Sequence, residues 1–232
     1  MKKIPLSVIL MVHNEEETIG QEVRRYYREI IKKIPQSELI IAEDGSIDKT
    51  REISHKLAKQ LPLVLQVTPE KRGYTKSLRM AFQKAKGELT FYADAGGKHD
   101  PKDFWKLYRQ INKFDFITGF KKNRHDPWYR LFLAWGLNTV ANLYFDVRFS
   151  DIDCGYKLFN RTTVNVLLAE SWVLKDNISL ELVLRAVYAG LKTTEIPVKH
   201  FAREFGPSRG LPLKKIPIVV AKLLLTFPRL KK

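Results

Sequence analysis

Residues 89–101 read Leu89-Thr90-Phe91-Tyr92-Ala93-Asp94-Ala95-Gly96-Gly97-Lys98-His99-Asp100-Pro101. Five residues of strand-like character lead into an acid, then a glycine pair, and then a typical helix start at Asp100-Pro101. A carboxylate at the C-terminal end of a buried strand is where open α/β sheets place their ligand chemistry. The same residues also suit an ordinary strand–turn–helix junction in which Asp100 only caps the helix, so the neighbouring segments must decide between the two.

The rest of the first half alternates between strand and helix patterns. Continuous apolar runs predict strands, and the amphipathic segments between them predict helices. The predicted strands cover residues 6–12, 38–42, 63–67, 89–93 and 114–119. This order predicts an α/β fold with a doubly wound, mostly parallel sheet, helices on both faces and a ligand edge at the C-terminal strand ends. The residues expected at that edge are His13, Glu43, Asp44, Asp94 and Gly96.

Composition narrows the class of partner. The chain has 232 residues, 44% of them hydrophobic, which is enough for a sizeable core and argues against disorder. Its one cysteine, Cys154, excludes a disulfide framework, fits a reducing compartment and is expected to be small core packing. No signal peptide is expected at the N-terminus. The net charge of +16 predicts an anionic partner: nucleic acid, a membrane surface or a phosphorylated substrate.

The second half contains two apolar segments that are not expected to be strands of the sheet. Residues 128–145 are aromatic but carry polar breaks, so a core or interfacial helix is expected rather than a membrane span. Residues 209–232 hold seven Lys or Arg and no acid around the apolar run 216–227. We therefore predict a domain at 1–210 and a basic amphipathic tail at 211–232. The tail is expected either to lie in an anionic membrane interface or to pack as a terminal helix on the sheet.

Five motifs, in order and spacing, resemble those of a known family. They are Met11-Val12-His13-Asn14-Glu15, Glu43-Asp44-Gly45-Ser46-Ile47-Asp48-Lys49-Thr50, Asp94-Ala95-Gly96-Gly97-Lys98-His99-Asp100-Pro101, Asp151-Ile152-Asp153-Cys154-Gly155-Tyr156-Lys157-Leu158-Phe159, and Arg203 with Gly206-Pro207-Ser208-Arg209. Over about residues 6–210 the chain resembles a family 2 glycosyltransferase with a GT-A fold. It is most similar to polyprenyl-phosphate sugar synthases of the dolichyl-phosphate mannose and glucose type.

The resemblance implies a nucleotide-sugar donor and assigns residues to it. His13, Glu15, Glu43 and Asp44 would read the base, and the glycine-bearing turn that ends in Lys76 would lie beside the donor. The loop with Arg203, Ser208 and Arg209 would cover the nucleotide sugar. A divalent metal, Mg or Mn, would be held by Asp94 against the diphosphate.

The resemblance also implies a polyprenyl-phosphate acceptor and an inverting transfer at the cytoplasmic membrane face. A phosphate is already anionic at neutral pH and hardly needs a general base, whereas Asp151 or Asp153 would be the base for a hydroxyl acceptor. Lys121, Arg130 and Arg203 are candidates to hold acceptor or leaving-group phosphates. The acidic pair could instead be turn formers, and Asp48 is expected to be a helix cap.

Two departures from the family pattern bear on these roles. Glu43 replaces an aspartate, which keeps the charge on a longer arm. Gly96 replaces the second acid of Asp-x-Asp and Lys98 replaces a glutamine, so one metal ligand is lost and a cation is added. The metal role is therefore in question, and Lys98 could serve the diphosphate in its place.

Two alternatives stay open beside the polyprenyl-phosphate hypothesis. The chain could transfer to a saccharide or protein hydroxyl. It could be a decayed, nucleotide-sugar-binding protein without activity, given the loss at Gly96. Nucleic-acid binding is not expected, because no recognition module is visible and the basic residues gather beside apolar segments.

Overall fold

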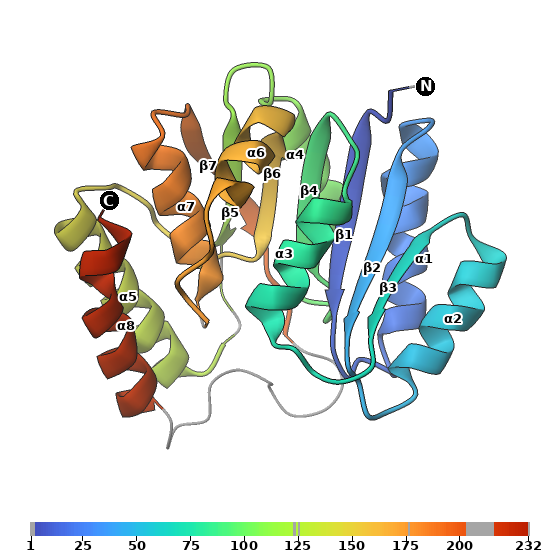
Figure 1. The fold of residues 1–232 in the computed structure, drawn as a ribbon, viewed down its shortest axis with the longest axis horizontal. Helices are drawn as coiled ribbons and strands as arrows, with labels where there is room; N and C mark the ends of the chain where they lie inside the picture. The colour runs from blue at the N-terminus through green and yellow to red at the C-terminus, as the bar shows by residue number, and fades with distance from the viewer. Residues whose placement is uncertain (1–2, 123, 125, 176, 203–215, 232) are drawn as a thin grey trace.

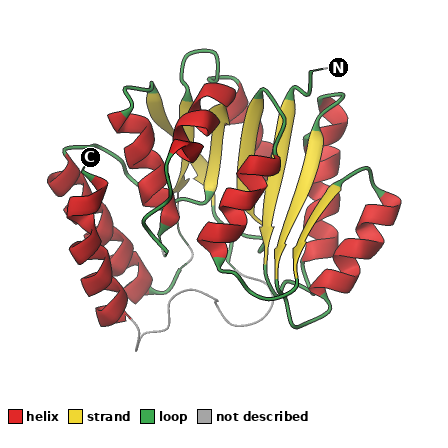
Figure 2. Ribbon diagram, in the orientation of Figure 1, coloured by secondary structure: helices red, strands yellow, loops and turns green. Residues whose placement is uncertain are grey.

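One sheet organises the molecule. The computed structural model describes residues 3–122, 124, 126–175, 177–202 and 216–231, and its seven strands have the order β3-β2-β1-β4-β6-β5-β7 (Figure 1, Figure 2). They are β1 (Leu6–Val12), β2 (Glu38–Asp44), β3 (Val64–Thr68), β4 (Leu89–Asp94), β5 (Phe116–Lys122), β6 (Tyr156–Asn160) and β7 (Thr193–Lys199). Within this described sheet β6 is antiparallel to both of its neighbours, and every other pair is parallel. The predicted α/β fold with a mostly parallel sheet is confirmed.

The central strands β1, β2 and β4 each carry a buried apolar run, because both faces of the sheet are covered there. In β1, Ile9 and Met11 join one hydrophobic core, whereas Val8 and Leu10 join the other. This alternation follows from the two-residue period of a strand. The continuous apolar run that predicted β1 is thus the sum of two buried faces.

Helices cover both faces, as predicted. On one face lie α1 (Ile19–Glu29), η1 (Ile31–Lys33), α2 (Thr50–Gln60), η2 (Pro101–Asp103) and α4 (Phe104–Tyr108). The other face is covered by α3 (Tyr74–Lys84), α6 (Arg161–Ala169) and α7 (Ile178–Tyr188). Asp100 caps η2 by accepting from the Lys102 N–H at 3.1 Å, as the sequence predicted.

Two local features differ from the sequence pattern. Asn14 followed by Glu17 has the spacing of a capping box, but this box does not form, because Asn14 has a positive φ of 54° and α1 begins only at Ile19, after Thr18. The helix α6 was not predicted, although Asn160 caps it by accepting from the Thr163 N–H at 2.9 Å. Neither difference moves the strand ends that carry the site.

The strand register brings the predicted polar residues together. Met11 pairs with Asp94 on one side of β1, and Val12 pairs with Glu43 on the other. The C-terminal ends of β4, β1 and β2 therefore lie side by side at one edge of the sheet, where a ligand site is expected.

Helices α5 (Trp128–Phe145) and α8 (Ile216–Leu230) lie side by side at one flank of the sheet (Figure 1). Phe227 of α8 stacks on Phe145 and Tyr144 of α5, with ring centroids 4.7 and 5.3 Å apart. Their remaining surfaces leave Trp128, Phe132, Trp135 and Leu225 more than half exposed. Among the described helices, none has both the length and the hydropathy needed to span a membrane.

Candidate active-site cleft

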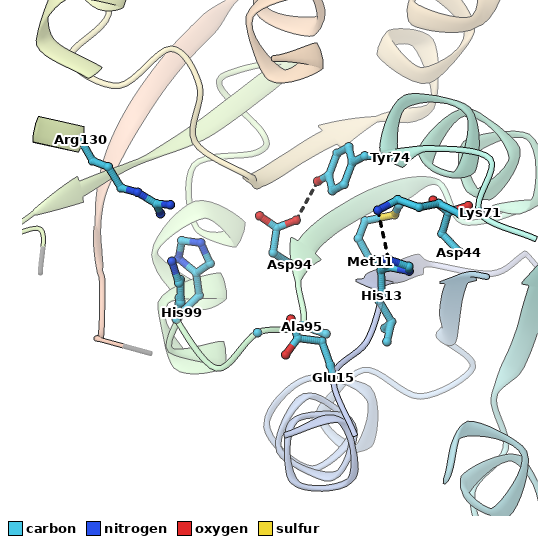
Figure 3. Close-up of a pocket in the computed structure, with 13 residues that line it drawn as sticks. Met11, His13, Glu15, Asp44, Lys71, Tyr74, Asp94, Ala95, His99 and Arg130 are labelled. Carbon is cyan, nitrogen blue, oxygen red and sulfur yellow. Dashed lines mark hydrogen bonds between the residues drawn. The ribbon is translucent and has the colours of Figure 1, made fainter. Parts of the chain in front are cut away.

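Two adjoining cavities open at the C-terminal edge of the sheet. The first cavity, of about 380 Å³, lies over the ends of β1 and β4 (Figure 3). The second cavity, of about 360 Å³, is lined from the turn after β4, the end of β5, α5 and the turn before β6. Four residues line both cavities, namely Asp94, Lys98, His99 and Arg130. The two cavities are therefore the halves of one cleft, and these four side chains lie where the halves meet.

Asp94 is fixed at the centre of the cleft. Its Oδ1 accepts a hydrogen bond from the Tyr74 hydroxyl at 2.7 Å (Figure 3). Its Oδ2 lies so close to Gly155 that a Cβ atom there would be 2.5 Å away. Burial raises the pKa of Asp94, against the opposing effects of the Tyr74 hydrogen bond, Lys121 and Lys98. The structure thus holds this carboxyl on two sides, in a position that faces both cavities.

The end of β2 shapes the far wall of the first cavity. Asp44 accepts hydrogen bonds from the backbone N–H groups of Arg72 and Gly73, at 2.9 and 3.0 Å. Gly45 has a φ of 60°, and a Cβ atom on it would lie 2.2 Å from the Lys71 nitrogen. Because only glycine allows this conformation and this close approach, the turn that leads into α3 is held against the sheet edge.

His13 and Glu15 line the first cavity beside Asp44, as predicted. The His13 Nε2 atom lies 3.1 Å from the Lys71 Nζ atom, which also lines this cavity. The Glu15 carboxylate accepts from the Thr18 hydroxyl at 3.1 Å. The wall is thus polar and carries both charges, which suits a nucleoside with donors and acceptors on its edge.

Two of the predicted donor residues do not line the cleft. Glu43 is fully buried beneath it, where it accepts from the Ser46 N–H and pairs with Arg51 at 3.2 Å. Lys76 is exposed on α3 and is not among the residues that line either cavity. The structure therefore gives Glu43 the task of holding the turn after β2.

Three further predictions cannot be placed. Arg203, Ser208 and Arg209 lie outside the described residues.

One wall of the second cavity is a row of alternating charges. Lys121 pairs with Asp151 at 3.1 Å, and Arg124 lies 3.9 Å from the other oxygen of Asp151. Arg124 also pairs with Asp126 at 3.0 Å, and the second oxygen of Asp126 lies 4.0 Å from Lys98. Although burial opposes it, Lys121 and Arg124 lower the pKa of Asp151. Asp151 is thus ionised and engaged by both cations.

Asp153 has a different environment in the same cavity. It accepts a hydrogen bond from the Asn177 amide at 3.1 Å, and burial raises its pKa to about 6. The fully buried Lys157 lies on the next strand and donates to the Thr118 hydroxyl at 2.8 Å. Burial lowers the pKa of Lys157 to about 8. Asp153 thus keeps its proton to a higher pH than an ordinary carboxyl group, whereas the pKa of its neighbour Asp151 is lowered.

Two histidines connect the turn after β4 with the end of β7. His99 and His200 form an isolated antiparallel bridge, and their rings lie 6.0 Å apart. Burial lowers the pKa of His99 to about 3 and that of His200 to about 4. Both rings are therefore neutral at physiological pH and add no charge to the cleft.

Several residues of the cleft were missed by the sequence analysis. They are Lys71, Tyr74, Arg124, Asp126, Asn177 and His200. A signal existed for Arg124 and Asp126, since they follow a predicted parallel strand and so fall at the ligand edge. Tyr74 and Lys71 flank the glycine turn before α3, which had been singled out only for Lys76.

An apolar groove of about 280 Å³ continues from the second cavity between α5 and α8. Leu133, Leu137 and Asn177 line both the groove and the second cavity. The remaining wall of the groove is aliphatic and aromatic, including Phe132 and Leu223. A ligand with a charged head and an apolar tail could therefore occupy both spaces at once.

The described residues of the cleft form no divalent-ion site by themselves. Among the described residues, no three His, Cys, Asp or Glu side chains form a group that could hold a metal. Asp94 is already hydrogen-bonded by Tyr74, and Gly96 lines the cleft without a side chain. The ammonium of Lys98 and the guanidinium of Arg130 line the same space.

Comparison with solved structures confirms the predicted GT-A fold. Glucosyl-3-phosphoglycerate synthase from Mycobacterium tuberculosis, solved with Mn²⁺, UDP and glucosyl-3-phosphoglycerate, has a TM-score of 0.72 at 16% identity, covering 96% of this chain and 79% of that one. Its complex with UDP has a TM-score of 0.75 at 15% identity, with 98% and 80% covered. Other structures of the same enzyme contain Mn²⁺ or Mg²⁺ with UDP or UDP-glucose.

Sequence relatives confirm the resemblance to polyprenyl-phosphate sugar transferases. The undecaprenyl-phosphate 4-deoxy-4-formamido-L-arabinose transferase of Pseudomonas fluorescens (strain Pf0-1) is 25% identical over 214 residues, 91% of this chain and 62% of the relative. The dodecaprenyl-phosphate galacturonate synthase of Rhizobium johnstonii is 25% identical over 222 residues, 90% and 62%. The chain thus spans less than two thirds of the length of either relative. The family described as glycosyl transferase family 2 matches residues 7–167, more than half of the chain, and the chain belongs to this family.

Proposed function

We propose that this chain transfers a sugar, with inversion at the anomeric carbon, from a nucleoside diphosphate sugar to a polyprenyl phosphate. The observation that carries the proposal is the continuity of three spaces: a polar first cavity, a second cavity lined by charges of both signs, and an apolar groove. A nucleotide, a phosphate and an isoprenoid chain would occupy them in that order. The relatives named above are similar over 90% of this chain or more, and their names describe polyprenyl-phosphate chemistry.

The arrangement of the cleft fits a displacement at the junction of the two cavities. An oxygen of the acceptor phosphate attacks the anomeric carbon from the second cavity, and the bond from that carbon to the diphosphate oxygen breaks toward the first. The electron pair of the broken bond leaves on the nucleoside diphosphate. Lys98 and Arg130 line both cavities, so their charges can stabilise the leaving diphosphate and the entering phosphate.

Asp151 and Asp153, two acids of the second cavity, then have different roles. Asp151 holds Lys121 and Arg124 in the wall, because its ionised carboxylate is engaged by both. Asp153, with a pKa raised to about 6, is the better proton acceptor. A phosphate needs no such base, so Asp153 would be required only if the acceptor were a hydroxyl.

We also propose that Lys98 and Arg130 reduce the need for a divalent metal. The GT-A neighbour binds Mn²⁺ or Mg²⁺ with UDP, but here Gly96 removes a carboxylate and Lys98 adds a cation two residues later. A divalent ion neutralises charge that develops on the leaving diphosphate, and fixed cations can supply part of the same effect. Asp94 would then shape the cleft through its hydrogen bond to Tyr74.

We place the enzyme peripherally on the cytoplasmic face of a membrane, where a polyprenyl phosphate would be met. Helices α5 and α8, which line the apolar groove, leave Trp128, Phe132, Trp135 and Leu225 more than half exposed. Aromatic side chains at this density suit an interface, and the basic residues of the tail 211–232 suit anionic lipid.

The test is a donor and acceptor screen with the full chain. Labelled UDP-, GDP- and dTDP-sugars are incubated with a short polyprenyl phosphate, with the matching polyprenol, or with 3-phosphoglycerate as a phosphate without a tail. We expect label to enter the organic phase only with the polyprenyl phosphate. Transfer to 3-phosphoglycerate at an equal or higher rate would refute the lipid acceptor, and transfer to the polyprenol would assign a hydroxyl acceptor. Binding of a nucleotide sugar without any transfer would indicate a decayed enzyme.

A further inference from the structure

Asp126 is a carboxylate in a cleft that must accept phosphate groups. Its side chain is only 8% exposed and belongs to the wall of the second cavity. An isolated acid at this position would repel an anionic ligand and would cost free energy to bury. The structure surrounds it with side chains from three different segments, two of them cations and one a neutral histidine, which offset that cost.

The three segments are the loops that follow β4, β5 and β7. From the first, Lys98 places its Nζ atom 4.0 Å from Oδ1 of Asp126. From the second, Arg124 donates from Nε to Oδ2 at 3.0 Å. From the third, His200 places Nε2 3.9 Å from Oδ2. Arg124, His200 and Lys98 lower the pKa of Asp126 against the effect of burial, so it is ionised at neutral pH.

The two charged partners face different parts of the cleft. Lys98 lines both cavities, whereas Arg124 lines only the second. A lysine has a long, flexible side chain whose ammonium can take many positions in an open cleft. Asp126 lies between Lys98 and Arg124, so it sets where both cations lie. It thereby also sets the distance between the positive charge near the donor diphosphate and the positive charge near the acceptor phosphate.

The backbone supports this fixed position. Asp126 immediately precedes Pro127, the N-cap residue of α5, so its place is set by the start of an 18-residue helix. Arg124 is held from its other side by Asp151, at 3.9 Å. The Arg124 guanidinium is therefore held between two carboxylates, Asp126 and Asp151.

We propose that Asp126 is a positioning residue of the transfer reaction, which holds Lys98 and Arg124 in place so that they contact the two reacting phosphate groups together. This inference rests on the proposed function for the identity of the ligands, but not for the arrangement of the charges. Preorganised cations stabilise a transition state more than mobile ones, because they need not reorganise as charge develops. Asp126 would thus favour phosphate chemistry although it is itself negative.

The sign of the effect separates positioning from simple repulsion. If Asp126 acts only through its charge, Asp126→Asn removes a repelling anion, and both pyrophosphate binding and transfer should improve. If Asp126 positions the cations, Asp126→Asn should lower kcat by roughly 10–100-fold, the size expected for a displacement of about 1 Å at a reacting group. The dissociation constant of inorganic pyrophosphate, measured by calorimetry, should rise by about threefold or more.

Three further variants complete the test. Asp126→Glu keeps the charge but moves it by one methylene group, so positioning predicts a loss of kcat and a pure charge effect predicts none. In a double-mutant cycle, Asp126→Asn should cost less in a Lys98→Met background than in the wild-type chain, because one of its two cationic partners is already gone. Asp146→Asn, at the other end of α5, removes the same charge and should leave kcat and pyrophosphate binding at wild-type values.

Two outcomes would overturn the inference: tighter pyrophosphate binding by Asp126→Asn, or full activity of Asp126→Glu together with additive effects in the cycle. Thermal unfolding of each variant controls for stability. Because pyrophosphate carries neither sugar nor lipid, its binding can be measured whatever the acceptor is. If no acceptor is found in the screen but Asp126→Asn binds pyrophosphate more weakly than the wild-type chain, the proposed function would be refuted, whereas the role of Asp126 in positioning Lys98 and Arg124 would be supported.

Discussion

Gly155→Ala tests whether the position of Asp94 controls the reaction. Gly155 lies in the turn before β6, and a Cβ atom there would be 2.5 Å from Oδ2 and 3.2 Å from Cγ of Asp94. Ordinary contacts between such atoms are about 3.5 Å, so the carboxylate must move by about 1 Å. Asp94 can move only by giving up its 2.7 Å hydrogen bond from Tyr74.

The expected cost follows from that displacement. A misplacement of about 1 Å at a reacting group lowers kcat by roughly 100-fold, or about 2.7 kcal/mol in the activation free energy. A hydrogen bond to a charged group contributes about 1.5–3 kcal/mol, and the partial exposure of this pair places the loss near the lower end. A loss of about 1.5 kcal/mol would lower Tm by about 3–6 °C in a chain of this size.

The assay is kcat for sugar transfer, with thermal unfolding on the same samples. Gly20→Ala is the matched control, since a Cβ atom there would meet its nearest neighbour, Cγ2 of Ile53, at 3.9 Å. Tyr74→Phe removes the same hydrogen bond without the clash and should share part of the effect. Wild-type kcat in Gly155→Ala would refute the reasoning, because it would show that the Asp94 carboxylate can move without consequence.

Three further predictions concern the metal, the membrane and pH. We expect sugar transfer by the wild-type chain to persist largely in EDTA, and the double variant Gly96→Asp with Lys98→Gln to depend on Mn²⁺. Complete loss of wild-type transfer in EDTA, with rescue by micromolar Mn²⁺, would contradict this prediction. Sedimentation with vesicles should require anionic lipid, weaken in high salt, and fall in Trp135→Ala or when residues 211–232 are removed; equal binding to neutral vesicles would count against it. Burial raises the pKa of Asp153 to about 6, above the value of about 3.9 in an unfolded chain. The contribution of Asp153 to stability is therefore present below about pH 4 and lost as the pH rises through 6. In urea unfolding, Asp153→Asn should be more stable than the wild-type chain by about 1–2 kcal/mol at pH 7.5 and equally stable near pH 4.

The central strands β1, β2 and β4 could be predicted because they are buried on both faces of the sheet. Such strands read as continuous apolar runs, and the predicted strand 6–12 coincides with β1. The direction of β6 could not be predicted, since a strand of five residues has the same pattern in a parallel or an antiparallel pair. Helix α6 was missed because its β-branched residues, such as Thr162, Thr163 and Val164, resemble a strand.

Some residues of the candidate site could likewise be predicted from the sequence, and others could not. Asp94, Asp151 and Asp153 were found because they lie in motifs at strand ends, and the structure places all three in one cleft. Glu43 lies in such a motif but supports the turn from below, which no motif could show. Arg124 and Asp126 lie in no motif; their position after a predicted strand places them at the ligand edge, but their contacts with each other and with Lys98 appear only once the loops after β4 and β5 are placed together.

The C-terminal helix shows why one sequence pattern left two alternatives open. An amphipathic helix has one apolar side, which either packs on the protein or meets the membrane. In α8, Phe227 is 2% exposed and packs on α5, whereas Leu225 is 79% exposed on another side. The helix is apolar around most of its circumference, so packing on α5 and an exposed apolar surface do not exclude each other. Because α5 is itself exposed at Trp135, the two helices are better treated as one unit: their shared side forms the apolar groove, and their outer side forms the surface that we expect to meet the lipid.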